Sequence, residues 1–105
     1  MTRRYTDSGS ERRALRARMH AERTAVQVGR GGLEDSVVGS AEDAIHAREL
    51  IKVSFGKGFE GSPREGADTL AERLDAEIVE VKGRTAVLFR PAEKEPAGPG
   101  EPPSA

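Results

Sequence analysis

The sequence predicts a single compact α/β domain in which three helices alternate with four short strands. Its 105 residues are enough for one domain and too few for two. Apolar residues recur at helical spacing in three segments, and four β-prone segments lie between or after them. The order helix, strand, helix, strand, helix, strand, strand implies at least one crossover connection and a final antiparallel pair. We therefore expect a four-stranded mixed sheet with the helices packed on it.

The first predicted helix is rich in arginine. Ser8 or Ser10 can cap it, and its periodicity continues to about Ala21, with Leu15 and Met19 on one face. Its surface is either solvated or in contact with phosphate, and the sequence favours neither interpretation. The side chains in question are those of Arg12, Arg13, Arg16, Arg18 and Arg23. Residues 1–7 before the helix are polar and are expected to be disordered.

Two strands and a second helix follow. Residues 24–28 are apolar on both faces, as in a buried strand, and residues 33–47 have helical periodicity. In the strand predicted at residues 49–55, Ile51, Val53 and Phe55 line one face, although Leu50 does not fit strict alternation. Lys52 points to the opposite face, where it is either solvated or part of an exposed face that contacts a ligand.

The last third of the domain contains a helix and a hairpin. Ser62, Pro63 and Glu65 have the spacing of a helix cap. The buried stripe of this helix is expected to be Ala67, Leu70, Ala71 and Leu74. Residues 77–82 and 85–90 are expected to pair through a tight turn at residues 83–84. Residues 92–105 contain no large apolar side chain and are expected to be disordered. Because large apolar residues are few, we expect the helices on one side of the sheet, with part of the sheet accessible.

Composition excludes several classes of function. The chain has no cysteine, and His20 and His46 are too few for a zinc site, so no metal or other cofactor is expected. No carboxylate pair or activated nucleophile stands out, so the sequence predicts no enzyme. It also has no apolar run long enough to span a membrane, and we expect a soluble cytoplasmic protein. Charge is unevenly distributed, since residues 1–23 carry seven arginines against three carboxylates although the net charge is −1.

The turn between the first strand and the second helix is the most informative motif. Gly29-Arg30-Gly31-Gly32 has the form G-x-x-G with a cation inside it. Its spacing does not match a dinucleotide-binding G-x-G-x-x-G, and it lacks the lysine of a Walker A loop. Either it is a plain turn without a ligand, or it clamps a single-stranded RNA backbone as the G-x-x-G loop of a KH domain does. In the second case Arg30 and the amides of Gly31, Gly32 and Leu33 would hold phosphate.

Four segments, taken together, resemble one protein family. They are R-R-A-L-R-A at residues 12–17 with His20, V-Q-V-G-R-G-G-L at residues 26–33, E-L-I-K-V at residues 49–53 and G-R-T-A-V-L-F-R-P at residues 83–91. Their order and spacing resemble those of the YhbY-like proteins, the stand-alone bacterial form of the CRM domain (chloroplast RNA splicing and ribosome maturation). The resemblance covers residues 8–91.

This resemblance implies a fold, a function and a set of site residues. The fold would be similar to the C-terminal domain of a bacterial translation initiation factor. The function would be RNA binding, in bacteria in association with precursors of the large ribosomal subunit and in plants in intron splicing. The implied RNA-binding residues are Gly29, Arg30, Gly31, Gly32, Arg12, Arg13, Arg16, His20, Lys52 and Arg84. Family members often have a basic C-terminal tail, whereas residues 92–105 are acidic here.

The sequence thus predicts a non-enzymatic RNA-binding protein, expected to be a monomer, with ribosomal RNA precursors as its partner and no small-molecule substrate. The main alternative is a protein–protein adaptor that docks through an exposed sheet face. An enzyme that binds a nucleotide at the glycine turn has less support, because no catalytic group is predicted beside it.

Overall fold

The computed structural model describes residues 4–6 and 8–92. Its elements follow the predicted order: α1 (Gly9–His20), β1 (Val26–Val28), α2 (Asp35–Arg48), β2 (Leu50–Phe55), α3 (Pro63–Leu74), β3 (Glu77–Lys82) and β4 (Thr85–Phe89). The four strands form one sheet in the order β1-β2-β4-β3. β1 and β2 are parallel, and the other two pairs are antiparallel. The predicted mixed sheet is confirmed, with β2 and β4 as its central strands.

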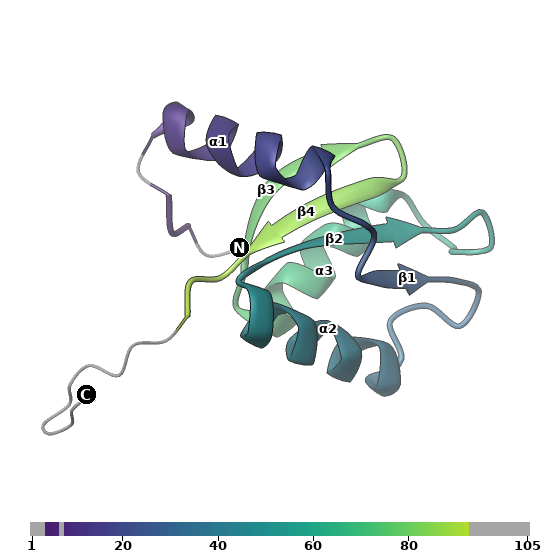
Figure 1. The fold of residues 1–105 in the computed structure, drawn as a ribbon. Helices are drawn as coiled ribbons and strands as arrows, with labels where there is room; N and C mark the ends of the chain where they lie inside the picture. Colours follow the sequence, from purple (N-terminus) through teal and green to yellow (C-terminus); the bar gives the residue numbers. More distant parts are fainter. Residues whose placement is uncertain (1–3, 7, 93–105) are drawn as a thin grey trace, which may run out of the picture.

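Helices cover both faces of the sheet. α2 and α3 lie on one face and α1 crosses the other, as Figure 1 shows. The main core fills the space between α2, α3 and the sheet, and Val28, Val53, Phe55, Leu70 and Leu88 are buried there. Ile51, Val53 and Phe55 share this core, as their alternation predicts. The prediction that the helices pack on one side only is wrong.

A second, smaller core explains the difference. Leu15 and Met19 of α1 pack against Leu50, Val79 and Val87 on the other face of the sheet. Leu50 breaks the alternation of β2 because α1 buries it on one face, whereas its neighbour Ile51 is buried in the main core on the other face. β3 has a bulge between Ile78 and Glu80. The bulge lets two adjacent residues face α1, so that Val79 joins the second core and Glu80 lies at its rim.

Side-chain caps that can be recognised in the sequence mark the starts of α1 and α3. The Ser8 hydroxyl accepts a hydrogen bond from the Glu11 amide at 3.2 Å and begins α1. Ser62 and Glu65 form the predicted capping box of α3, with Pro63 in its first turn. α2 differs from the prediction, because it begins at Asp35, two residues later than expected. Its cap, Glu34, makes no side-chain capping bond.

The N-terminal segment also differs from its prediction. Thr6 is 4% exposed, within a stretch expected to be disordered. The amides of Tyr5 and Thr6 and the Thr6 hydroxyl all donate hydrogen bonds to the buried carboxylate of Glu77 in β3. These hydrogen bonds hold the segment in place although it contains few apolar side chains. Residues 1–3 and 7, and the predicted tail from residue 93 onward, lie outside the described residues.

Within the described part of the chain, no helix is both long and apolar enough to cross a membrane.

Candidate functional site

The glycine turn lies where β1 leaves the sheet. The Gly32 amide donates to the Gly29 carbonyl at 3.0 Å, which closes a tight turn with Arg30 at its exposed tip. Gly32 has a φ of 73°, a conformation that favours glycine. The Gly32 amide is therefore engaged by the turn itself, contrary to the prediction that it is free for phosphate. Within the described residues, the amides of Gly31 and Leu33 donate no hydrogen bond.

An acidic side chain lies against this turn. A Cβ added at Gly31 would overlap the carboxylate of Glu34, so that carboxylate contacts the loop at the glycine beside Arg30. Glu34 is the cap residue of α2, where the amides and the dipole of the helix attract negative charge. An anion that approached the turn from this side would compete with Glu34.

A second glycine-rich loop, residues 56–62, lies beside the first. The Gly56 amide donates to the Val28 carbonyl at 2.8 Å, which joins the two loops at their base. Further out, a Cβ at Gly58 would lie 3.4 Å from the Cβ of Arg30, so the loops are in van der Waals range. Lys57, between the two glycines, is exposed. Two loops predicted separately thus form one surface.

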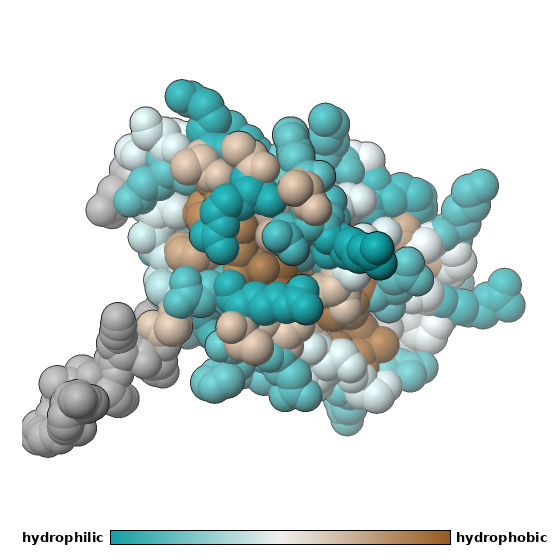
Figure 2. Space-filling view, viewed as in Figure 1, coloured by the Kyte–Doolittle hydropathy of each residue, from teal (hydrophilic) through white to brown (hydrophobic). Residues whose placement is uncertain are grey.

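Arg84 completes this end of the sheet. It lies in the turn between β3 and β4, and its guanidinium donates to the Phe55 carbonyl at 2.8 Å and the Gly56 carbonyl at 2.6 Å. We call the surface formed by residues 29–32, residues 56–62 and Arg84 the loop end. Figure 1 shows both loops and the β3–β4 turn at the same end of the sheet. In Figure 2, hydrophilic side chains project from that end.

The cations of the loop end have no acidic partner. Among the described residues, Arg30, Lys57 and Arg84 take part in no ion pair. The hydrogen bonds of Arg84 go to neutral carbonyls, which hold the guanidinium in place and bring no negative charge beside it. The loop end therefore offers three positive charges against one exposed carboxylate, that of Glu60, beside glycine backbone, and its net positive charge suits an extended polyanion.

The other predicted site residues are not gathered at the loop end. Arg12 pairs with Glu77 at 3.2 Å and Arg16 with Glu80 at 3.7 Å, so both reach toward β3. Arg13 is exposed on α1. His20 and Lys52 line a cavity of about 310 Å³ under the C-terminal end of α1. The Lys52 ammonium donates to the Glu22 carbonyl at 2.9 Å, on the face that the alternation of β2 predicts.

Sequence reasoning missed two functional candidates. Lys57 is absent from the predicted site, although the Gly56-Lys57-Gly58 spacing could have marked a second flexible loop with a cation at its tip. Glu77 is predicted only as part of the strand at residues 77–82. No local signal identifies it, because its donors come from residues 65 to 72 positions away.

Comparison with known proteins assigns the chain to a family. The family model described as the CRS1/YhbY (CRM) domain matches residues 8–90. The chain belongs to the CRM domain family. The "Probable RNA-binding protein YqeI" of Bacillus subtilis is 34% identical over 83 residues, which covers 79% of this chain and 86% of that protein. The "Probable RNA-binding protein MJ0652" of Methanocaldococcus jannaschii is 38% identical over 88 residues, which covers 82% of this chain and 65% of that longer protein.

A solved structure supports the same assignment. The solution structure of the hypothetical protein SAV1595 from Staphylococcus aureus matches this CRM domain with a TM-score of 0.71 and 29% identity. The match covers 88% of this chain and 96% of that one. The family resemblance predicted from the four sequence segments is confirmed.

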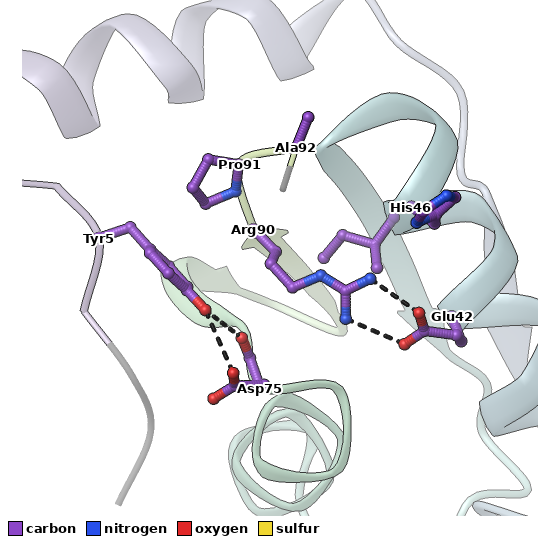
Figure 3. Close-up of a pocket in the computed structure, with 8 residues that line it drawn as sticks. Tyr5, Glu42, His46, Asp75, Arg90, Pro91 and Ala92 are labelled. Carbon is purple, nitrogen blue, oxygen red and sulfur yellow. Dashed lines mark hydrogen bonds and ion pairs between the residues drawn. The ribbon is translucent and has the colours of Figure 1, made fainter. Parts of the chain in front are cut away.

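A cavity lies at the opposite end of this CRM domain from the glycine loops. It has a volume of about 470 Å³ and is lined by Tyr5, Glu42, His46, Asp75 and Arg90, with Pro91 and Ala92 at its edge (Figure 3). Arg90 binds Glu42 through two hydrogen bonds of 2.7 and 3.0 Å and also donates to the Leu74 carbonyl. These bonds lower the pKa of the Glu42 carboxyl and raise that of Arg90.

Arg90 therefore connects α2, the end of α3 and β4, and its charge is already matched. This explains why an arginine follows the last strand of the CRM domain in this chain, in the G-R-T-A-V-L-F-R-P segment. Within the described residues, no cluster of three or more metal-ligating side chains is present.

Proposed function

We propose that this protein binds single-stranded RNA through its sugar–phosphate backbone at the loop end. The observation that carries the proposal is the convergence of three unpaired cations, Arg30, Lys57 and Arg84, around two adjacent glycine loops. Glycine backbone lets a phosphate approach closely, and the cations supply the attraction. Two relatives carry RNA-binding names, which supports RNA rather than another polyanion.

The finer proposal is that the RNA belongs to precursors of the large ribosomal subunit. It rests on the resemblance to the YhbY-like proteins. Sedimentation of cell extract through a sucrose gradient tests it. We expect the protein to migrate with large-subunit precursors, and recovery only at the top of the gradient would count against a stable association.

The alternative of an adaptor that docks proteins on an open sheet face has less room than the sequence suggested. α1 covers the apolar half of that face, and Leu50, Val79 and Val87 are buried beneath it. The net positive charge of the loop end favours a polyanion over a protein partner. We therefore retain RNA binding alone.

A mobility-shift assay on single-stranded fragments of ribosomal RNA precursor tests the mechanism. Each phosphate neutralised on a single strand contributes a slope of about −0.7 to the plot of log affinity against log salt. We expect Arg30→Gln with Lys57→Gln to weaken binding and to reduce the slope by about 1.4 if both cations contact phosphate. Arg48→Gln, at the exposed C-terminal end of α2, is the matched control.

Two results would contradict this mechanism. If the double variant keeps the affinity and the slope of the native protein, the loop end is not the phosphate site. If Arg48→Gln, which removes one charge instead of two, reduces the slope by half as much as the double variant does, the attraction comes from total charge rather than from this surface.

A further inference from the structure

The face of the sheet that carries α1 is apolar at one end and polar at the other. Near the start of β2 and the end of β4 it is apolar, with Leu50 and Phe89 in the second core. Toward the loop end the residues become polar. There the strand registers align Gln27 with Ser54, Ser54 with Thr85 and Thr85 with Lys82, one residue from each strand. We call these four residues the polar row. It crosses the whole sheet and is about 14 Å wide from the strand spacing.

The polar row lies beyond the end of α1. The helix ends at His20, and the chain then turns away to begin β1 (Figure 1). Gln27 and Lys82 are exposed, and Ser54 and Thr85 are partly exposed although they occupy the two central strands. The faces of central strands are normally covered by another layer, so an open polar stretch there is a site that another molecule can cover.

Two cavities flank this row. One, of about 140 Å³, is lined by Gln27 and Ser54 together with Val28, Gly29 and Gly56, so it adjoins the loop end. The other, of about 310 Å³, contains Thr85 and Lys82 and continues under the end of α1. Its remaining lining is Met19, His20, Lys52, Glu80 and Val87. The row therefore connects the glycine loops to a pocket on the same face of the sheet, next to the end of α1.

The chemistry of the row differs from that of the loop end. Gln27, Ser54 and Thr85 are uncharged and can both donate and accept hydrogen bonds, as base edges require. The pocket beyond them has an apolar floor, because Met19 and Val87 are 5% and 6% exposed. A planar imidazole at its rim, that of His20, can stack on a base. The single carboxylate of the pocket, Glu80, is paired with Arg16.

We propose that the polar row and the adjoining pocket bind the bases of the single-stranded RNA whose backbone is held at the loop end. This inference rests on the proposed function and adds a base-contacting site to it. Gln27, Ser54 and Thr85 contact base edges, and one base enters the pocket above Met19 and Val87. The loop end supplies attraction, and the row supplies discrimination between bases.

NMR titration of the full chain tests the proposal. Three probes of similar length are used: oligoadenylate, oligouridylate and inorganic polyphosphate, which carries charge but no bases. We expect both oligonucleotides to shift the amides of residues 29–32. The Gln27 side-chain amide and the methyl groups of Met19, Thr85 and Val87 should also shift with the oligonucleotides. Polyphosphate should shift the loop amides alone.

Each outcome decides between the two proposals. If the oligonucleotides shift the loop amides and leave the row and pocket unchanged, the base site is refuted and the proposed function stands. If polyphosphate shifts the row and pocket as strongly as the oligonucleotides do, the row is a second phosphate site and the base site is again refuted. If no probe shifts either region, both proposals fail.

Affinity measurements with variants give an independent readout. Gln27→Ala and Thr85→Val each remove hydrogen-bonding groups without altering charge, and we expect about threefold to tenfold weaker binding with an unchanged salt slope. Ser40→Ala, an exposed hydroxyl on α2, is the matched control. Native affinity in both row variants would overturn the proposal, and circular dichroism establishes that each variant is folded.

Discussion

Replacing Glu77 by glutamine tests the most connected polar group that the structure describes. Glu77 is 3% exposed, and one of its carboxylate oxygens accepts the amides of Tyr5 and Thr6. The other accepts the Thr6 hydroxyl at 2.7 Å and the Arg12 guanidinium at 3.2 Å. The carboxylate thus holds the N-terminal segment and α1 to the first residue of β3.

The magnitude follows from what glutamine can replace. Its oxygen can keep the two amide bonds, and the Thr6 hydroxyl can rotate to accept. The amide nitrogen then faces the Arg12 guanidinium, donor against donor, so one charge-assisted bond is lost. Such bonds contribute about 1.5–3 kcal/mol, and we expect Glu77→Gln to lower the free energy of unfolding by about 2 kcal/mol at neutral pH. With a denaturant slope of about 1–3 kcal/mol/M, the urea midpoint should fall by about 1 M.

The pH dependence provides a second signature. Burial by itself raises the pKa of Glu77, but the hydrogen bonds from Thr6, Tyr5 and Arg12 outweigh it and hold the pKa below its ordinary value of 4.5. The unfolded chain therefore binds more protons than the folded protein as the solution becomes acidic. The contribution of Glu77 is complete above pH 4.5 and is lost as the pH falls through the folded-state pKa.

Urea denaturation at pH 7 and at a series of acidic pH values measures both effects. The Glu77→Gln variant should start less stable and lose less stability on acidification. Some acid dependence should remain, because Arg90 also lowers the pKa of Glu42. Asp43→Asn, an exposed carboxylate on α2, is the control. Equal stability of Glu77→Gln and native protein at pH 7, or an unchanged pH dependence, would refute the reasoning.

Two further predictions follow from the glycines and the loop end. A Cβ at Gly66 would lie 2.6 Å from the Phe55 ring and 2.8 Å from the Phe59 ring, so Gly66→Ala should destabilise. Overpacking costs about 1–3 kcal/mol against a helix-propensity gain of about 1 kcal/mol. Gly39→Ala on α2, with open space at the Cβ, should stabilise in the same urea assay, and a stabilised Gly66→Ala would contradict the packing. Glu34→Gln removes the carboxylate at Gly31 and should strengthen RNA binding in the mobility-shift assay, whereas unchanged or weaker binding would show that Glu34 does not compete with phosphate.

Much of the fold could be predicted because its signals are local. The capping box of Ser62 and Glu65 and the buried stripe of α3 need only neighbouring residues to be recognised. The alternation of β2 likewise identified the core face of that strand. The position of α1 could not be predicted this way, since its contacts with β2 and β3 join distant segments. Leu50 carried the relevant signal, as an apolar residue on the face expected to be open.

The candidate site was predictable only in part for the same reason. The Gly29–Gly32 turn is a contiguous motif, and Arg84 belongs to a family-like segment, so both were found. That they lie at one end with Lys57 depends on the parallel pairing of β1 with β2 and on the antiparallel β3–β4 turn. The polar row depends on the register of all four strands, and no segment of the sequence contains more than a fragment of it.

The arginines of α1 show how a charge count can mislead. Seven arginines precede β1, and the sequence left a solvated and a phosphate-contacting helix face as equal alternatives. The structure adds a third role, because Arg12 and Arg16 lie beside the apolar face of α1 and meet the carboxylates of Glu77 and Glu80. To bind phosphate, Arg12 would have to leave a carboxylate that is almost inaccessible to water. An unpaired buried charge costs more than an exposed arginine–phosphate contact returns. RNA binding should therefore leave Arg12 where it is, and the cations of the loop end should contribute more to the salt dependence of binding than Arg12 does.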